Sequence, residues 1–450
     1  MTLANRIVLK VLAAIALLSA MACTSTSPTT PNLLPTTATP EGGVVTAYEN
    51  ARVFDGRRFE TRTLYMQADH FIRPPANSIS VKTVDLEGAF VTPPFAEAHN
   101  HVTPPSTFLS TRFLTDGIFY VMNPTTVVAP FEGSEPFFER QDTYDVLVSM
   151  GGVTAPGGHP EKLYVEFLGP QFYNNRSRED FEGDAFHYVS KEEDIDPVLD
   201  LLQEQGAQFV KTYLLYSEEF EKRDGDEAYY GATGLNPALF PKLVDAAHAR
   251  GLRVAVHVET DFDALTAATA GVEFLAHLPG YNPSKDQEMI DLGRLSEGTI
   301  SALKDNQVVV IPTYIISAAR YDRLERNSPS LALRPEHEAM QRDNLKRLLA
   351  AGVPIAVGTD GFGKATQEAE NYVRLGAMSR TQALSLLTNT GNHIFPDRAL
   401  GKLLPGYEAS FIAFKADPTA APLGDAKPYI HVKQGKTLGP FRPDLLQPRK

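Results

Sequence analysis

Six residues of types that bind metal ions stand near the ends of short apolar runs spread over most of this chain. They are His99, His101, Lys211, His257, His277 and Asp360. In an extended strand alternate side chains share a face, so His99 and His101 point the same way and can share one ion. Ligand types that recur at strand ends favour a fold in which the carboxyl ends of many strands meet.

Helical patterns lie between these candidate strands, and several of them close just before a glycine. The helical stretches span residues 196–205, 237–250, 262–270 and 336–350. The candidate strands end near His101, Asn123, Gly151, Lys211, His257, His277, Tyr314 and Asp360. Eight strands that alternate with helices predict a (β/α)₈ TIM barrel of class α/β over residues 93–399, and such barrels carry their active sites at the carboxyl ends of the strands.

The six residues, in this order and placement, resemble the amidohydrolase superfamily. Within it they are similar to the binuclear-metal imidazolonepropionase-like and dipeptidase (prolidase)-like enzymes. The resemblance covers most of the chain after residue 44, and Gly157-Gly158-His159 looks like a turn common in this subset. It implies that His99, His101 and Asp360 hold one divalent ion, that His257 and His277 hold a second, and that Lys211 bridges both after carboxylation by CO₂.

The ligand chemistry agrees with this expectation. Imidazole nitrogens and carboxylate oxygens suit zinc and its first-row neighbours, and the absence of thiolate ligands fits an open catalytic site. An unmodified lysine at position 211 would repel a cation and could form an ordinary salt bridge, whereas a carbamate there offers two oxygens. Zinc is therefore the expected metal, with two ions in the site.

Two such ions lower the pKa of a bridging water enough to supply hydroxide near neutral pH. In the family the aspartate that matches Asp360 accepts the proton and passes it to the leaving nitrogen. We therefore expect hydrolysis of a carbon–nitrogen, amide-type bond in a small molecule, either a cyclic amide or a dipeptide. An esterase, lactonase or phosphotriesterase on the same metal site, and a non-catalytic surface-tethered binding protein, are the alternatives.

Four further residues near the candidate strand ends are candidates for substrate contact. They are His159, Tyr213, Tyr281 and Tyr314. Tyrosines at a barrel rim also serve in packing, so we expect only one or two of them to line the pocket. Long connections over residues 176–194, 217–233 and 317–337 are either lids or disordered segments.

The first 23 residues predict a signal peptide that is not part of the fold. Arg6 and Lys10 precede an apolar stretch from Val11 to Ala22, which is short for a membrane span. Cys23 is the single cysteine, and its position resembles that of the lipid-modified cysteine of bacterial lipoproteins. We expect an exported cell-envelope lipoprotein, on the periplasmic side or the cell surface. Ordinary cleavage near Ala22, which gives a secreted or periplasmic protein, is the alternative.

Residues 24–43 predict an extended tether, because thirteen of the seventeen residues from Thr24 to Pro40 are Ser, Thr or Pro. Short alternating strands over residues 44–92 and 400–440 predict a small β domain, which in the family is a β-sandwich made from both terminal segments.

The formal net charge of -13 opposes binding to nucleic acid. A small-molecule substrate is the expected partner. We expect membrane contact only through a lipid anchor at Cys23, and the oligomeric state stays open.

Overall fold

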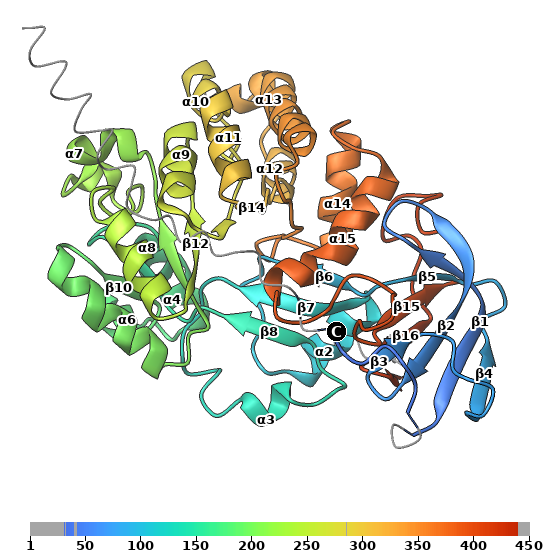
Figure 1. Ribbon diagram of the computed structural model, residues 1–450. Coiled ribbons are helices and arrows are strands. Elements are labelled where there is room, and N and C mark those ends of the chain that lie inside the picture. Colours follow the sequence, from blue (N-terminus) through green and yellow to red (C-terminus); the bar gives the residue numbers. More distant parts are fainter. Residues whose placement is uncertain (1–30, 32, 40–42, 285, 440–450) are drawn as a thin grey trace, which may run out of the picture.

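The protein is an α/β structure in which a mixed β-sheet lies beside two parallel sheets and their helices (Figure 1). The computed structural model describes residues 31, 33–39, 43–284 and 286–439, so the predicted signal peptide and Cys23 lie outside the described residues. Within the described ranges, no helix is both long and apolar enough to cross a bilayer.

The mixed sheet combines strands from both terminal parts of the chain. Its strands are β1 (Val45–Phe54), β2 (Phe59–Gln67), β3 (His70–Ile72), β4 (Val81–Asp85), β5 (Phe90–Thr92), β15 (Phe411–Phe414), β16 (Ile430–Lys433) and β17 (Lys436–Thr437). The strand order is β17-β16-β15-β5-β1-β2-β3, with β4 paired to β1. Val91 of β5 pairs with Ala413 of β15, which joins the two terminal segments. The sheet has its own apolar core around Val53, Phe71 and Phe411.

The remaining strands form two parallel sheets. They are β6 (Phe95–Glu97), β7 (Ile118–Asn123), β8 (Asp145–Val148), β9 (Gly152–Thr154), β10 (Phe186–Tyr188), β11 (Phe209–Tyr213), β12 (Arg253–His257), β13 (Phe274–Leu275) and β14 (Val309–Val310). The sheet orders are β6-β7-β8 and β10-β9-β11-β12-β13-β14. Hydrogen bonds also run between the sheets, from Gln208 N to the Val148 carbonyl at 2.8 Å. On the other side Ile355 bridges to Val310, and Ala98 N donates to the Val357 carbonyl at 2.7 Å.

Helices connect these strands along most of the chain. They are α2 (Thr107–Thr115), α3 (Glu135–Phe138), α4 (Gly169–Phe172), α5 (Arg178–Phe181), α6 (Ile195–Glu204), α7 (Phe220–Arg223), α8 (Phe240–Ala249), α9 (Asp261–Ala270), α10 (Gln287–Leu292), α11 (Glu297–Asp305), α12 (Ile315–Tyr321), α13 (Pro329–Ala351), α14 (Ala365–Arg374) and α15 (Arg380–Ile394). α9 shows why such helices begin and end where they do: Thr260 and Asp263 form a capping box, and Gly271 closes it at φ +84°.

Burial explains the near-continuous apolar runs of the parallel strands. Every residue of β7 and β11 is buried, as expected for parallel strands covered on both faces. A buried polar residue in such a strand must therefore point at other polar groups. Lys211 lies in the middle of β11, although the sequence placed it at the strand end. The ladder continues because Thr212 and Tyr213 pair with Val256 and His257.

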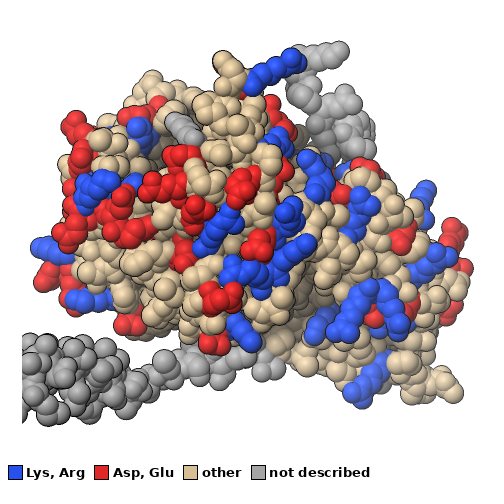
Figure 2. Space-filling model, turned by 90° about the horizontal axis from the view of Figure 1, so that it is seen from above, with Lys and Arg blue, Asp and Glu red and all other residues tan. Residues whose placement is uncertain are grey.

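Other boundaries also differ from the predicted ones. β14 ends four residues before Tyr314, and Ile355 forms an isolated bridge rather than a named strand. α13 begins at Pro329 and continues through Pro335, so residues 317–337 are mostly helical rather than a loop. The segment 217–233 carries α7 and two turns of 3₁₀ helix. In Figure 2 acidic side chains gather toward the left of the view, the side on which α7 lies in Figure 1.

The C-terminal half of the predicted tether contacts the mixed-sheet domain. Leu34 N donates to the Gly406 carbonyl, and Arg73 N donates to the Thr36 carbonyl, each at 2.8 Å. Thr39 N donates to the side chain of Gln67 at 2.9 Å. This part of the segment is thus bound to the folded unit instead of forming a free spacer, because its backbone groups find partners on the strands and loops of that domain.

Candidate metal centre

His99, His101 and Asp360 form the most compact group of potential metal ligands among the described residues. Oδ1 of Asp360 lies 2.8 Å from Nε2 of His101 and 3.3 Å from Nε2 of His99. The two Nε2 atoms are 3.1 Å apart. Three donor atoms that converge in this way, two imidazole nitrogens and one carboxylate oxygen, can bind one divalent cation.

The backbone around Asp360 is shaped to bring the aspartate to the histidines. The N–H groups of Thr359 and Asp360 both donate to the carbonyl of His99, at 3.0 and 2.8 Å. Asp360 has a φ of +55°, a left-handed conformation that is unusual for a residue other than glycine. A Cβ on Gly358 would lie 2.6 Å from Cβ of His99, so the close approach of the two segments requires glycine there.

The other three predicted ligands lie against this group. The ring centroids of His99 and His277 are 4.9 Å apart, and those of His277 and His257 are 4.5 Å apart. Lys211 is 2% exposed, and burial lowers the pKa of its amine to about 7 although Asp360 opposes that shift. The structure therefore brings together all six residues that the sequence analysis assigned to the metal site.

Hydrogen bonds determine which ring nitrogen of two histidines is free to bind a metal. Nδ1 of His101 lies 2.8 Å from the carbonyl of Thr125, which can only accept. Nδ1 of His277 lies 2.6 Å from Oγ1 of Thr313, whose own hydrogen is donated to the Pro312 carbonyl at 2.7 Å. In both rings Nδ1 therefore carries the hydrogen, and Nε2 keeps the lone pair that a metal requires.

The protonation states of the residues in the centre also suit a bound cation. Burial lowers the pKa of His99 to about 3, and it lowers the pKa of His257 and His277 well below the ordinary value, so all three rings are neutral at pH 7. Burial opposes ionisation of Asp360, but the electrostatic effect of His99, followed by that of His101, holds its pKa well below the usual range. Neutral imidazoles, an ionised carboxylate and an amine that readily loses its proton together fit a pair of divalent cations.

Three of the four predicted substrate residues also lie at this centre. The ring centroid of His159 is 5.0 Å from His257 and 5.1 Å from Tyr213, and the ring of Tyr281 stacks on His277 at 4.0 Å. Tyr314 does not join them by any contact seen in the described residues. Its hydroxyl donates to Glu338 of α13 at 3.2 Å, which places it in helix packing.

The turn that carries His159 is held by a buried carboxylate. Glu161 is fully buried and accepts from Gly157 N at 2.7 Å, and it pairs with Arg178 at 2.7 Å. A Cβ on Gly158 would meet Oγ1 of Thr154 at 2.5 Å. The glycine pair thus lets the turn pack closely enough to present His159 beside His257.

A cavity of about 230 Å³ lies on the His257 side of the centre. Its lining residues are Tyr216, Glu259, Gly280, Asn282, Pro283, Ser284, Asp286, Met289, Leu292 and His337. Glu259 is the link to the centre, because its Oε1 lies 3.1 Å from Nε2 of His257. The cavity therefore reaches to within one side chain of a predicted metal ligand.

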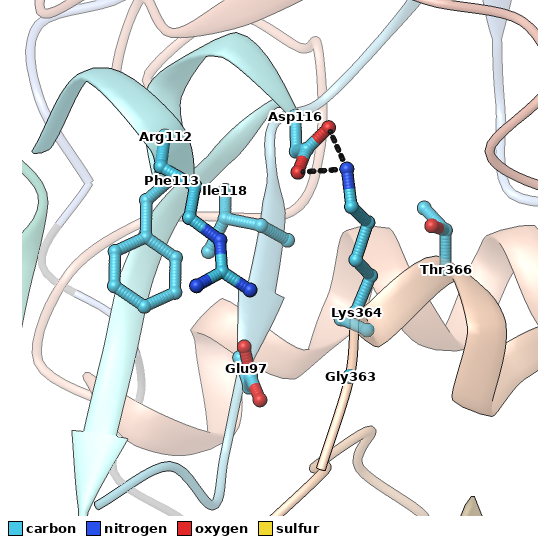
Figure 3. Close-up of a pocket in the computed structure, with 9 residues that line it drawn as sticks. Glu97, Arg112, Phe113, Asp116, Ile118, Gly363, Lys364 and Thr366 are labelled. Carbon is cyan, nitrogen blue, oxygen red and sulfur yellow. Dashed lines mark hydrogen bonds and ion pairs between the residues drawn. The ribbon is translucent and has the colours of Figure 1, made fainter. Parts of the chain in front are cut away.

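A second, much smaller cavity lies between Glu97 of β6, Arg112 of α2 and Lys364 at the start of α14 (Figure 3). It encloses about 20 Å³, room for a single water, and is too small for a substrate. Figure 3 shows the guanidinium of Arg112 extended toward Glu97, while Lys364 is paired with Asp116, at 2.8 Å. Glu97 is 2% exposed and accepts from Thr359 and from Asn100, so it ties the segment of His99 and His101 to that of Asp360.

Replacing Glu97 tests this connection. Glu97→Ala leaves the hydroxyl of Thr359 and the amide of Asn100 without their buried acceptor, which costs about 1–3 kcal/mol for each unsatisfied group. Glu97→Gln keeps an oxygen at the same place, so we expect it to cost less than about 1.5 kcal/mol. Urea unfolding measures both. Equal stability of the Ala variant and the unaltered protein would show that the hydrogen bonds accepted by Glu97 contribute nothing to the free energy of unfolding.

The sequence analysis missed four residues that support the ligands. They are Glu97, Thr125, Glu259 and Thr313. Glu259 carries the one usable signal, since it is an acidic residue two positions after a predicted ligand at a strand end. Thr125 and Thr313 each follow a proline in a loop, and only the fold brings them to their histidines.

Comparisons with known proteins agree with the site. The amidohydrolase family matches residues 162–438, more than half of the chain, so the chain belongs to that family. It is thereby a hydrolase of the amidohydrolase type. No curated protein sequence matches the chain significantly.

Solved structures with the same fold extend over nearly the whole chain. Ochratoxinase of A. niger has 17% identity and a TM-score of 0.65, and the match covers 89% of this chain and 98% of that one. A putative prolidase from Bifidobacterium longum has 16% identity and a TM-score of 0.64, covering 88% and 94%. Molinate hydrolase has 14% identity and a TM-score of 0.66, covering 90% and 97%. Identities this low show a common fold alone.

Proposed function

We propose that the protein is a binuclear metal hydrolase that cleaves the amide-type carbon–nitrogen bond of a cyclic amide or a dipeptide. The observation that carries the proposal is the convergence of the six ligand candidates from separate parts of the chain. Membership of the amidohydrolase family supports the reaction class. Prolidase and ochratoxinase among the proteins of the same fold support the prolidase-like subset.

The residues of the centre divide into two ligand sets and a bridge. His99, His101 and Asp360 would hold one divalent ion, zinc by ligand type, and His257 and His277 would hold the other. Lys211, carboxylated by CO₂, would contribute one oxygen to each. The lowered pKa of Lys211 supports this role, because only the unprotonated amine reacts with CO₂. When bound, two such ions supply an activated water molecule and polarise the substrate carbonyl.

Asp360 is the group that moves the proton. Its low pKa keeps the carboxylate ionised, so it can accept a proton from the attacking water and deliver it to the leaving nitrogen.

Two exposed apolar side chains lie near the ligand candidates in the sequence. Val102 follows His101 and is 51% exposed, and Phe362 lies two residues after Asp360 and is 40% exposed. These two side chains would contact an apolar part of the substrate, while the cavity lined by Glu259 would take a polar part.

The proposed architecture is the closed (β/α)₈ barrel of residues 93–399 beside a β-sandwich of residues 44–92 and 400–440. Two observations support closure: the hydrogen bond between Gln208 and Val148, and the bond from Ala98 to Val357. The first joins the end of β8 to the start of β11. The second joins the end of β6 to the segment of Val357, which bridges to β14 through Ile355 and Val310. A closed barrel would bring the ends of all eight strands to one rim, which is where the ligand candidates lie.

Substrate panels test the proposed reaction. Purified chain loaded with zinc and bicarbonate is assayed against dipeptides, cyclic amides, lactones and phosphotriesters, and we expect kcat/KM to be highest for an amide. Preferential turnover of lactones or phosphotriesters would contradict the amide assignment, because the same ligand set also serves those reactions. Absence of turnover on every class would favour a binding protein.

We also propose export with a lipid anchor at Cys23, based on the predicted signal segment and the single cysteine. Mass analysis of the mature N-terminus of protein purified from membranes tests this proposal. A terminus that begins at a diacylglyceryl-modified Cys23 is expected. An unmodified terminus elsewhere would contradict it.

A further inference from the structure

Glu259 lies two residues after His257 and turns its side chain back toward the candidate metal centre. Its Oε1 lies 3.1 Å from Nε2 of His257, and its side chain is 10% exposed. When the Glu259 carboxyl group accepts this bond, Nε2 of His257 carries the hydrogen. A neutral imidazole has one N–H group, and Nδ1 of His257 is therefore the atom left to bind a metal.

Glu259 also contacts the residue that stacks on the second histidine. The hydroxyl of Tyr281 bonds to the Glu259 carboxylate, and Gly280 N donates to the Glu259 carbonyl at 2.9 Å. The ring of Tyr281 lies parallel to that of His277, with centroids 4.0 Å apart and an interplanar angle of 13°. It meets His257 edge-on at 5.7 Å. One glutamate thus acts on His257 directly and on His277 through Tyr281.

We infer that Glu259 is a positioning residue that orients both histidines of the second cation site. The inference depends on the proposed function, because it concerns how that site holds its metal. His101 and His277 donate to uncharged acceptors, the carbonyl of Thr125 and the hydroxyl of Thr313. The partner of His257 is instead a carboxyl group. A hydrogen bond to its ionised form is stronger and makes the ligand nitrogen more basic. The second site should therefore depend on Glu259 more than the first does.

Zinc affinity tests the inference without reference to activity. Glu259→Gln, Glu259→Ala and Tyr281→Phe are titrated with Zn²⁺ in competition with a chromophoric chelator, and Co²⁺-loaded samples give the visible spectrum of each site. Glu370→Gln is the matched control, because Glu370 of α14 is 9% exposed and pairs with Arg380 of α15 and not with a histidine.

We expect Glu259→Ala to weaken binding of one ion by about 10- to 100-fold and to leave the other unchanged. Glu259→Gln keeps a neutral acceptor of the same size and should fall between Ala and the unaltered protein, so it serves even if the Ala variant does not fold. Tyr281→Phe keeps the stacked ring and should lose less affinity. Unaltered affinity for both ions in all three variants would overturn the inference alone. Failure of the unaltered chain to bind any zinc would overturn the proposed function as well.

Discussion

If Lys211 is the proposed bridging ligand, Lys211→Ala should reduce kcat by more than about 100-fold, because loss of a direct ligand costs more than loss of an outer partner, which costs about 10–100-fold. The lysine is buried and its amine pKa is lowered to about 7, so near neutral pH part of it is in the unprotonated form that reacts with CO₂. Steady-state kinetics on the best amide substrate measures the loss.

Small molecules added to the Lys211→Ala variant distinguish two possible roles of the lysine. It is either a carbamate that bridges two cations or a positively charged ammonium. Acetate supplies two carboxylate oxygens in the space that the side chain leaves, so it should restore part of the activity if the carbamate bridges two cations. Methylammonium should restore nothing. Rescue by methylammonium and not by acetate would mean that the lysine acts as an ammonium. Lys364→Ala is the control, since Lys364 pairs with Asp116 away from the histidines and should retain full activity.

Asp360→Asn should lower kcat by about 10²–10⁴-fold, the usual contribution of a positioned general base, and the lost ligand charge adds to that. Asparagine has nearly the same shape, so the hydrogen bonds of the backbone at positions 359 and 360 can persist. The variant should keep its thermal unfolding midpoint within a few degrees. Kinetics and thermal unfolding are measured on the same sample.

Asp116→Asn provides the comparison for that variant, because Asp116 is a partly buried carboxylate that pairs with Lys364 rather than with a histidine. It should leave kcat unchanged. If Asp360→Asn turned over substrate at the unaltered rate, Asp360 would have no part in proton transfer.

The sequence grouped residues that the structure brings together, because burial leaves few options for a polar residue in a parallel strand. A polar residue such as Lys211 or His257 inside or just after a fully apolar run must find polar partners, and strand ends supply them. The alternation of strands and helices then predicts that the carboxyl ends of the parallel strands lie close together. For this reason His99 and Asp360, 261 positions apart in the sequence, could be assigned to one site.

What the sequence did not predict depends on loops and on long-range hydrogen bonds. Tyr314 was expected at the pocket, yet its hydroxyl bonds to Glu338 because α12 follows it directly and α13 packs alongside. Thr313, its neighbour, contacts His277 instead. Neither orientation follows from a local pattern, since both depend on the path of the chain after β14. The extension of α13 through Pro335 was missed for a related reason, because proline is a frequent helix boundary.

The content of divalent ions in folded protein tests the central claim most directly. The full chain is purified in the presence of zinc and bicarbonate, freed of loosely bound metal by gel filtration, and analysed by elemental mass spectrometry with its folding checked by circular dichroism. We predict two zinc ions per chain. Correctly folded chain that holds no divalent ion after this treatment would contradict the account, because the six ligand candidates would then have no metal to bind.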